Sequence, residues 1–561
     1  SMSQRPQKRG STTRLPAPDG GCEAWGMVAI AFTVMMHSSS MHYITGLFFV
    51  AWLDDFPHQS RAQLASVGSL STAIMFGCAY LSGRLQYHWR SQGAVVLAGA
   101  ILASAGLLLS SYVTDAWQLY ITFSVIVGVG HALAFPPCPV VVSTWFKGKI
   151  GIALGITTAG ASIGTIYLGF LFVVVDRVSG WRVAFRALAL ASFVAIGAAA
   201  FIFRVPGGSG TLKRVSDILS ESIMDLSHHK RERSESHDVH KKRTNKGKLQ
   251  ILALLKHPRF SRVCLAYLLV AFAFDVPFVH LVRYALDENT STDKADWLTA
   301  AVGIGGLCRV FVMSAADHIG KERVFTVVLF SLTISNLFLP IIIHDYIGAL
   351  AYAFVIGVAT GCLVALVLPL STTALKPIDG ESEEDAGRKA MEGLDIALSL
   401  RGSTSLRMTF SEALEDQEAR DAAAADWPPS SSITSGLVYS SIAIGVFVGP
   451  VLVGWLYDHT GSYGVGFFCC GIFCFVACLV SFSLLPEGVT RLRCCGHEEE
   501  SSMRFNDEIT DENMSTKQTQ QVGRNNIEEN WRQNTTSSSS DSAEMSEDKQ
   551  LNMATIFSTN L

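Results

Sequence analysis

Long apolar stretches alternate with short polar ones along most of the chain. Each apolar stretch is about as long as the ~20 helical residues that cross the ~30 Å hydrocarbon core of a bilayer. None shows the alternating apolar and polar positions of a strand in a membrane barrel, so the pattern predicts transmembrane helices. The predicted spans are 24–51, 63–83, 92–112, 117–143, 150–175, 182–203, 260–286, 297–316, 323–343, 346–371, 433–456 and 464–485.

Two longer polar segments divide these spans into groups of six, four and two. The grouping predicts an all-α membrane protein of twelve transmembrane helices in two six-helix bundles. The tails and the second polar segment cannot bury enough apolar surface to offset their ordering entropy, which predicts disorder there. The predicted parts are a cytoplasmic N-terminal tail (1–23), a first bundle (24–204), a cytoplasmic basic linker (205–256), a second bundle (257–486) with a cytoplasmic insertion (376–432), and a cytoplasmic C-terminal tail (487–561).

The overall composition disfavours several classes of protein. Hydrophobic residues make up 49% of the 561 positions and charged residues 16%, and the net charge is −4. A disordered chain needs the reverse balance, and a nucleic-acid partner needs excess base. The sequence shows no nucleophile–base set, phosphate loop or metal-ligand spacing, so we expect neither an enzyme nor a bound cofactor or metal.

The distribution of Lys and Arg predicts the orientation in the membrane. Basic residues are dense in the linker and follow spans two and four, whereas the other loops carry few. Since positive charge gathers in cytoplasmic loops, we expect both termini and the linker on the cytoplasmic side of the membrane. We expect that membrane to be the plasma membrane. The sequon at Asn289 then falls in an outside loop, as glycosylation requires.

Two six-helix halves joined by a long basic loop are typical of carriers whose halves rock around a central site. Glycines should then mark helices that approach closely. Span five carries them at four- or five-residue spacing for most of its length, at Gly151, Gly155, Gly160, Gly164 and Gly169. Pro136, Pro137 and Pro139 should break span four, which transporters tolerate where backbone lines a cavity.

Ionisable residues inside the spans are the candidate site. A charge at membrane depth costs several kcal/mol and normally faces a cavity or a partner. Arg309 lies near the middle of span eight, and its planar guanidinium suits a carboxylate, which favours anion or zwitterion binding over a structural ion pair. Asp275, His42 and His131 are candidates for proton coupling, although His131 also fits a packed, hydrogen-bonded histidine.

Asp275 and Arg283 are two helical turns apart in span seven, so they should share a face. Contact of Arg283 with substrate is one interpretation of this spacing. Snorkelling of its long side chain to the outer surface is the other, and it is slightly favoured.

Five groups of short motifs stand in or beside the predicted spans. They are Pro18-Asp19-Gly20-Gly21 with Trp25; Trp145-Phe146-Lys147-Gly148-Lys149 with Ala153-Leu154-Gly155-Ile156 and Ala159-Gly160; Gly180-Trp181-Arg182 with Phe185; Val276-Pro277-Phe278-Val279-His280-Leu281; and Gly449-Pro450 with Gly454-Trp455-Leu456-Tyr457-Asp458 and Thr460-Gly461-Ser462-Tyr463. Together they cover both halves and resemble signatures of the monocarboxylate transporter family, a branch of the major facilitator superfamily. The resemblance implies conformational roles for Asp19, Gly20, Gly21, Lys147, Gly155, Gly160, Arg182, Gly454 and Asp458.

The resemblance implies passage of small organic acids, amino acids or related solutes by alternating access. It maps Arg309 onto the arginine of the family's eighth span, which pairs with substrate carboxylate. The chain departs from the family pattern at three candidate site positions, and Cys22-Glu23-Ala24 displaces the Trp of the first motif. Gly305 stands where proton-linked members have an acidic residue, His42 or Tyr43 where they have a lysine, and Thr360 where carriers of iodothyronines and aromatic amino acids have an aspartate.

We therefore predict an alternating-access carrier of small monocarboxylates, in which Arg309, His42, Tyr43, Thr360 and Phe278 contact substrate and proton symport uses His42 or Asp275. One alternative is a facilitative carrier of a bulkier solute, such as an aromatic amino acid, a creatine-like compound or a vitamin. The other is a non-transporting membrane sensor or scaffold. Beyond the lipid bilayer, a candidate partner is a single-span immunoglobulin-like glycoprotein, which some family members need to reach the surface.

Overall fold

The computed structural model describes residues 19–89, 91–203, 251–375 and 431–485. All regular elements in these ranges are helices, as the apolar pattern predicts. The predicted tails, linker and insertion lie largely outside the described residues, although 251–256 are helical.

The first half of the bundle makes six crossings. Their helices are α1 (Cys22–Ser38), α2 (Ser40–Tyr43) and α3 (Thr45–Asp55); α4 (Arg61–Gly77) and α5 (Ala79–Trp89); α6 (Gln92–Ser110); α7 (Ala116–Leu119), the π-helix η1 (Tyr120–Val127), α8 (Gly128–Ala134) and α9 (Pro137–Trp145); α10 (Ile150–Ser179); and α11 (Trp181–Ile202).

The second half makes six more. Their helices are α14 (Pro258–Phe274) and α15 (Val276–Asp287); α16 (Thr292–Leu307) and α17 (Arg309–Ile319); α18 (Lys321–Ile342); α19 (Tyr346–Thr373); α22 (Ser431–Thr460); and α23 (Gly464–Phe482). Eleven crossings in the described residues have the length and composition to span a membrane, and the remaining one is the first, which is divided among α1, α2 and α3.

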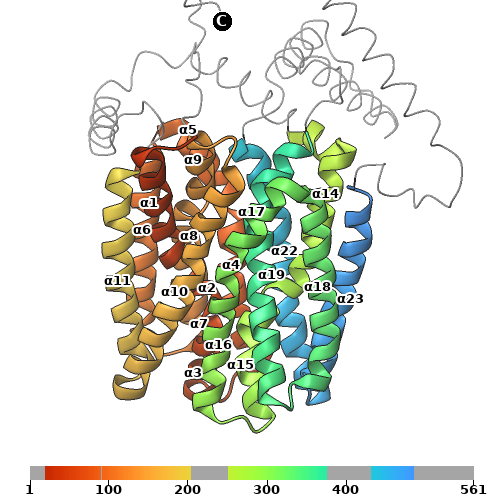
Figure 1. The fold of residues 1–561 in the computed structure, drawn as a ribbon. Coiled ribbons are helices and arrows are strands. Elements are labelled where there is room, and N and C mark those ends of the chain that lie inside the picture. The colour runs from red at the N-terminus through yellow and green to blue at the C-terminus, as the bar shows by residue number, and fades with distance from the viewer. Residues whose placement is uncertain (1–18, 90, 204–250, 376–430, 486–561) are drawn as a thin grey trace, which may run out of the picture. The chain divides into compact units, whose positions relative to one another are not determined.

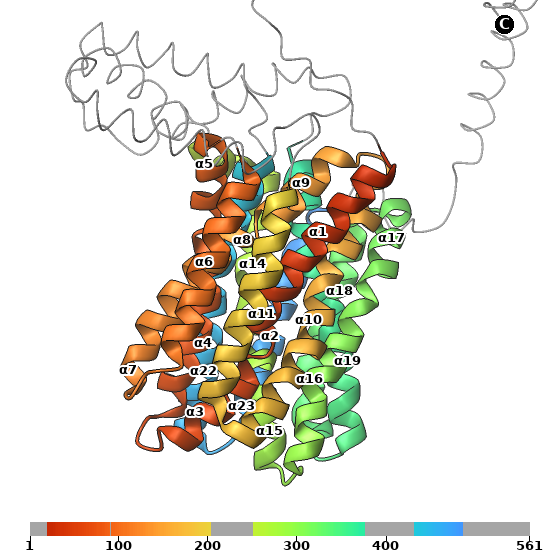
Figure 2. The same ribbon diagram turned by 90° about the vertical axis from the view of Figure 1, so that its left-hand side faces the viewer.

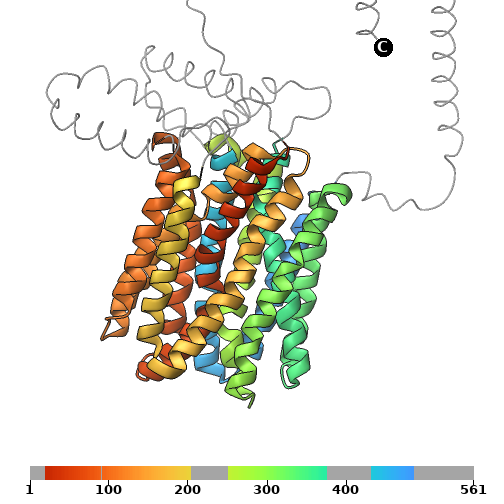
Figure 3. The ribbon, with the colours of Figure 1, turned by 60° about the vertical axis from the view of Figure 1, so that its left-hand side comes forward.

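Helices of the two halves lie side by side along the bundle (Figures 1 and 3), with the first half coloured red to yellow and the second green to blue. α4 packs along α22, and α10 packs against α1, α16 and α17 (Figure 2). We call the end of the bundle near residues 19, 203, 251, 375, 431 and 485 the linker end. The opposite end, where α15 ends and α16 begins and which holds residues 288–291, is the short-loop end, at the bottom of Figure 1.

Several crossings are interrupted, some at positions where the apolar pattern predicts one continuous helix. The predicted break in span four is confirmed, because α8 ends at Ala134 and α9 begins at Pro137. Span seven breaks at Asp275, two residues before Pro277, whose ring nitrogen cannot donate to the preceding turn. Span eight breaks at Cys308, immediately before Arg309, and no proline marks that position in the sequence.

The glycines of α10 lie where neighbouring backbones come close. A Cβ on Gly160 or Gly164 would overlap the α1 carbonyls of Phe32 or Met36, so these glycines let α1 and α10 touch. Gly155 faces the second half, where a Cβ would lie 3.3 Å from the Cα of Val310. The row therefore packs α10 against both its own half and the other one.

Candidate functional site

Arg309 is buried at the contact between the two halves. It opens α17, and the side chain is 1% exposed. Its Nε donates to the Gly306 carbonyl at 2.6 Å, and its two terminal nitrogens donate to the Thr158 carbonyl at 3.1 Å and the Ser162 hydroxyl at 2.5 Å. Among the described residues, no carboxylate forms a salt bridge with it, so this permanent cation is held by neutral oxygens only.

Two glycines provide the space for the guanidinium. A Cβ on Gly306 would lie 2.7 Å from one of its terminal nitrogens, and a Cβ on Gly361 of α19 would overlap the guanidinium itself. Because Thr158 and Ser162 belong to α10, the group is enclosed by α10 of one half and by α16 and α19 of the other. The site thus lies where relative movement of the halves would change its contacts.

An aromatic pair lies beside the arginine. Tyr43 of α2 stacks on Phe278 of α15, with ring centroids 4.4 Å apart and an interplanar angle of 24°. The Tyr43 side chain also interacts electrostatically with both Arg309 and Asp275. The aromatic pair therefore joins the two halves beside Arg309 and Asp275.

Two histidines, His42 of α2 and His131 of α8, form a buried pair. Nε2 of His42 lies 3.1 Å from Nδ1 of His131, and Nδ1 of His42 lies 3.1 Å from the Thr72 hydroxyl. His131 is fully buried, and its Nε2 has no hydrogen-bond partner among the described residues. The pair is hydrogen-bonded, as the packed-histidine interpretation predicts, but it also leaves one ring nitrogen unused.

Asp275 occupies the break between α14 and α15. It is 1% exposed, and neither carboxyl oxygen has a hydrogen-bond partner among the described residues. Thr72 of α4 is the polar side chain that lies next to it. A buried carboxyl without a donor is unusual, because burying a polar group without a hydrogen bond costs free energy.

The structure thus brings five of the predicted site residues around Tyr43: Arg309, Phe278, Asp275, His42 and His131. Thr360 is buried in α19 next to Gly361, and its hydroxyl donates to the Ile356 carbonyl of its own helix at 2.6 Å. Sequence analysis missed the neutral partners of these charges, which are Thr72, Thr158 and Ser162. The available signal was small polar residues four apart within the glycine-rich span five.

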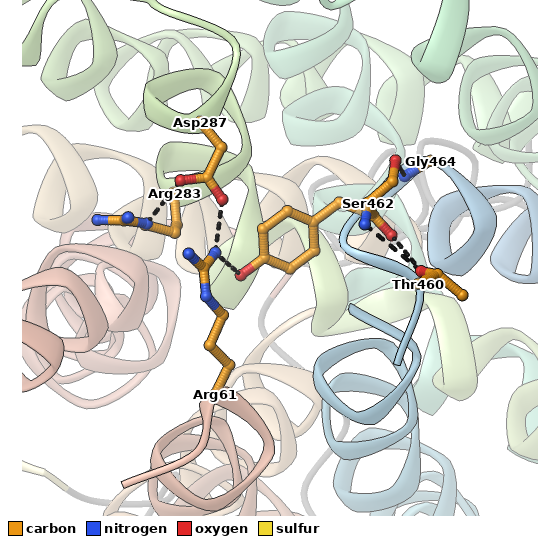
Figure 4. Close-up of polar contacts among 7 residues, drawn as sticks. Arg61, Arg283, Asp287, Thr460, Ser462 and Gly464 are labelled. Atoms are coloured by element: carbon orange, nitrogen blue, oxygen red, sulfur yellow. Dashed lines mark hydrogen bonds and ion pairs between the residues drawn. The ribbon is translucent and has the colours of Figure 1, made fainter. Parts of the chain in front are cut away.

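A second polar cluster, the outer clamp, closes the short-loop end between the halves (Figure 4). We define it as Arg61, Asp287, Arg283, Tyr463 and Tyr457. Arg61 of α4 forms a 2.5 Å ion pair with Asp287 of α15, donates to the Tyr463 hydroxyl at 3.0 Å, and lies over the Tyr457 ring at 3.9 Å. Arg283 pairs with Asp287 at 3.0 Å.

The clamp also shows the partner of Arg283. Arg283 pairs with Asp287 of its own helix, and Asp275 is at the break where that helix begins. The Arg283 side chain is 27% exposed, so it reaches toward the surface as the snorkelling interpretation predicts.

The remaining signature residues hold loops and helix ends together. Arg182 pairs with Asp55 at 2.8 Å inside the first half, near the short-loop end. At the same end, Asp458 accepts a hydrogen bond from the Ala62 backbone at 3.3 Å, and Gly454 lets Ala62 approach α22. Gly20 and Gly21 adopt φ angles of 150° and 90° before α1, which favour glycine.

Asp19 ties the start of the first crossing to the loop after the fourth. Its carboxylate accepts hydrogen bonds from the backbone N–H groups of Lys147 and Gly148. These donors hold the pKa of Asp19 below its usual value of 3.8. Lys147 therefore contributes through its backbone rather than its charge.

We expect Asp19→Asn to lower the thermal stability of the purified protein modestly at neutral pH. Because the folded-state pKa is depressed, the stabilisation is present above the ordinary pKa of 3.8 and is lost as pH falls through the folded-state value. Melting curves of both proteins across acidic pH should therefore converge at the acid end. A difference that stays constant with pH would show that the ionised carboxylate contributes nothing.

Comparison with known proteins gives the family. The sequence family described as Major Facilitator Superfamily matches residues 24–379, which is more than half of the chain. The chain belongs to the Major Facilitator Superfamily. This facilitator is similar to monocarboxylate transporter 10 of Rattus norvegicus, 24% identical over 81% of this chain and 76% of the relative. It is also similar to monocarboxylate transporter 12 of Xenopus laevis, 26% identical over 83% and 90% respectively.

Monocarboxylate transporter 12 of Homo sapiens is 26% identical over 87% of this chain and 86% of the relative. These names confirm the resemblance that the five motifs predict. The family and the helices together make this facilitator a multi-pass membrane protein with a transport function. They also argue for a transporter rather than an enzyme.

Proposed function

We propose that this facilitator carries small monocarboxylates or related organic anions by alternating access, with Arg309 binding the carboxylate. The observation that carries the proposal is the buried guanidinium, which has neutral oxygens as its hydrogen-bond partners and no carboxylate paired with it among the described residues. A charge at this depth costs free energy unless an opposite charge compensates it. A substrate carboxylate, bound by the planar fork of Arg309, supplies that charge.

The proposal extends to the direction of access. The outer clamp joins the halves at the short-loop end, so opening there requires Arg61 to leave Asp287. The positive-charge pattern supports an orientation with this end outside and both termini cytoplasmic, and the proposal includes the plasma membrane as the location. An immunoglobulin-like single-span partner belongs to the same proposal, by analogy with the family resemblance.

A second candidate function is gradient-independent carriage of a bulkier solute. One observation favours it: a Cβ on Gly305 would overlap the Phe354 carbonyl, so the site has no room for an acidic side chain one turn before Arg309. Proton coupling by the arrangement expected of proton-linked relatives is therefore unavailable at that position.

Uptake by purified protein in proteoliposomes tests both candidates. We expect labelled lactate or pyruvate to enter faster than into protein-free liposomes and to be competed by unlabelled monocarboxylates. An inward proton gradient should raise the accumulation. Uptake of aromatic amino acids or creatine but of no monocarboxylate, with no response to the gradient, would establish the second candidate instead. Absence of flux for every solute in a broad panel would contradict both.

A further inference from the structure

We infer that Asp275 is the proton-binding carboxyl of the transport cycle and that Thr72, His42 and His131 form the path by which the proton reaches it. This inference rests on the proposed function, because it assigns the coupling ion of the same central site. It assigns the proton to Asp275 and not to the position one turn before Arg309, because Gly305 occupies that position.

The surroundings of the Asp275 carboxyl group favour a bound proton. Asp275 lies at a helix break, is 1% exposed, and has no hydrogen-bond donor to either oxygen among the described residues. No salt bridge of the described residues includes it. A bare negative charge in such surroundings is strongly unfavourable, so the carboxyl needs a bound proton or another cation.

A row of side chains that can exchange protons begins beside the Asp275 carboxyl. Thr72 lies next to Asp275, its hydroxyl lies 3.1 Å from Nδ1 of His42, and Nε2 of His42 lies 3.1 Å from Nδ1 of His131. The row ends at Nε2 of His131, which has no partner among the described residues. From there, hydrogen-bonding distances link His131, His42 and Thr72, and Thr72 lies next to the Asp275 carboxyl.

The proton balance of the row is simple. Before transfer, His131 and His42 each carry their proton on Nδ1 and donate toward His42 and Thr72. A proton that binds Nε2 of His131 displaces the Nδ1 proton of His131 to Nε2 of His42. The Nδ1 proton of His42 then moves to the Thr72 hydroxyl, whose own proton moves to the Asp275 carboxylate. The net change is one proton gained at Nε2 of His131 and one proton delivered to Asp275, with both imidazoles neutral and in the other tautomer.

Other titratable groups surround Asp275. The buried titratable side chains on Asp275's own crossing and on the elements packed against it are His42, Tyr43, Cys264, Tyr267, His280, Tyr284, Tyr352, Cys362, Tyr439, Cys470, Cys474 and Cys478. The charged residues Arg61, Arg283 and Asp287 pair with one another at the short-loop end. Of the buried side chains, Tyr43 interacts electrostatically with Asp275, and it also interacts with Arg309. His280 is bonded elsewhere, with Nε2 2.9 Å from the Pro450 carbonyl.

Coupling follows from this placement. A substrate anion on Arg309 and a proton on Asp275 together leave the centre of the bundle without an uncompensated charge, which favours movement of the loaded carrier. Asp275 belongs to the second half, whereas Thr72, His42 and His131 belong to the first. Rocking of the halves therefore separates the carboxyl from its proton path and allows release on one side only.

Two assays on the same proteoliposomes test this inference. The first measures lactate accumulation driven by an inward proton gradient, with protein-free liposomes subtracted and internal pH followed by a trapped dye. The second measures exchange of labelled for unlabelled lactate at equal pH on both sides, which needs the carrier but no net proton movement. One-to-one coupling supports about tenfold accumulation for a gradient of about one pH unit.

We expect Asp275→Asn to lose gradient-driven accumulation and lactate-dependent acidification while exchange continues. Thr72→Val keeps the shape of the side chain but removes the hydroxyl, and it should slow gradient-driven uptake roughly tenfold or more, since positioned proton-transfer groups contribute about 100-fold or more. Asp54→Asn changes an exposed carboxyl of α3 and should leave both assays unaltered.

The outcomes separate this inference from the proposed function. Wild-type protein that neither exchanges nor accumulates lactate contradicts the proposed function. Wild-type exchange together with gradient-driven uptake that persists in Asp275→Asn and Thr72→Val contradicts the proton assignment alone. If Asp275→Asn also loses exchange, the Thr72→Val protein decides between the two. Asp275-dependent exchange of amino acids but not of lactate would assign the carboxyl to a substrate ammonium group and overturn the inference.

Discussion

Replacing Arg309 by glutamine is expected to lower kcat/KM for monocarboxylate uptake by about 30-fold to several thousand-fold. The range corresponds to the ~2–5 kcal/mol lost when one member of a buried, hydrogen-bonded charge pair is removed. Glutamine can still donate to the Ser162 hydroxyl or the Thr158 carbonyl, so the fold should survive. Arg309→Lys retains the charge but not the planar fork and should fall between the two proteins.

Initial uptake rates over a range of substrate concentrations measure this effect, and a monodisperse elution profile of each variant checks folding. Arg323→Gln is the matched control, because Arg323 is an exposed arginine in the first turn of α18. Transport by Arg309→Gln that equals transport by Arg323→Gln would remove Arg309 from the binding site. A loss in both would point to a general effect of removing positive charge.

The second large effect is expected at the outer clamp. Arg61→Gln removes the ion pair with Asp287, whose partners are 17% and 18% exposed, and the hydrogen bond to Tyr463. Hydrogen bonds to charged groups contribute about 2 kcal/mol, so the equilibrium between closed and open short-loop ends should shift toward open by roughly 30-fold. Side chains behind the clamp should then become accessible from that side.

A cysteine placed at Val282 reports this opening. Val282 is 5% exposed and lies on α15, which packs against α3. A membrane-impermeant maleimide should label Val282→Cys faster in the Arg61→Gln background, with peptide mass spectrometry distinguishing it from the native cysteines. Arg177→Gln is the comparison, since Arg177 joins the halves at the same end through pairs with Asp293 and Asp296 but is 50% exposed. Exposed pairs contribute about 0–1 kcal/mol, so its effect should be small. Equal labelling in all three backgrounds would show that the clamp does not control access.

The helical architecture was predictable because membrane insertion acts on local sequence. A stretch such as 346–371 must form a helix in hydrocarbon, since no other conformation of a single segment satisfies its backbone hydrogen bonds. The same constraint makes span ends visible, and proline marks the break in span four at Pro136 and Pro137. The break before Arg309 was not predicted, although Gly305 and Gly306, which weaken a helix, stand just before Cys308.

The candidate site was predictable in its charged members and not in its neutral ones. Arg309, Asp275 and His131 stand out in the sequence because each is rare at membrane depth. Ser162 and Thr72 do not stand out, since a hydroxyl in a transmembrane helix usually bonds its own backbone, as Thr360 does. Their role depends on which helix faces them; spacing within one helix can show that polar residues share a face, but not which residue of another helix that face contacts.

The amino-acid sequence by itself determined the helical class, the number of crossings and the family resemblance of this facilitator, because each follows from local hydrophobicity or from short motifs. Only the tertiary structure decided that Arg309 lies against α10 of the other half, that Asp275 meets Thr72 rather than Arg283, and that Arg61 closes the short-loop end with Asp287. These contacts join residues that are 147 to 226 positions apart in the sequence. Such contacts arise from how twelve similar apolar helices pack, and the hydrophobic pattern that creates the helices is nearly the same for every arrangement of them.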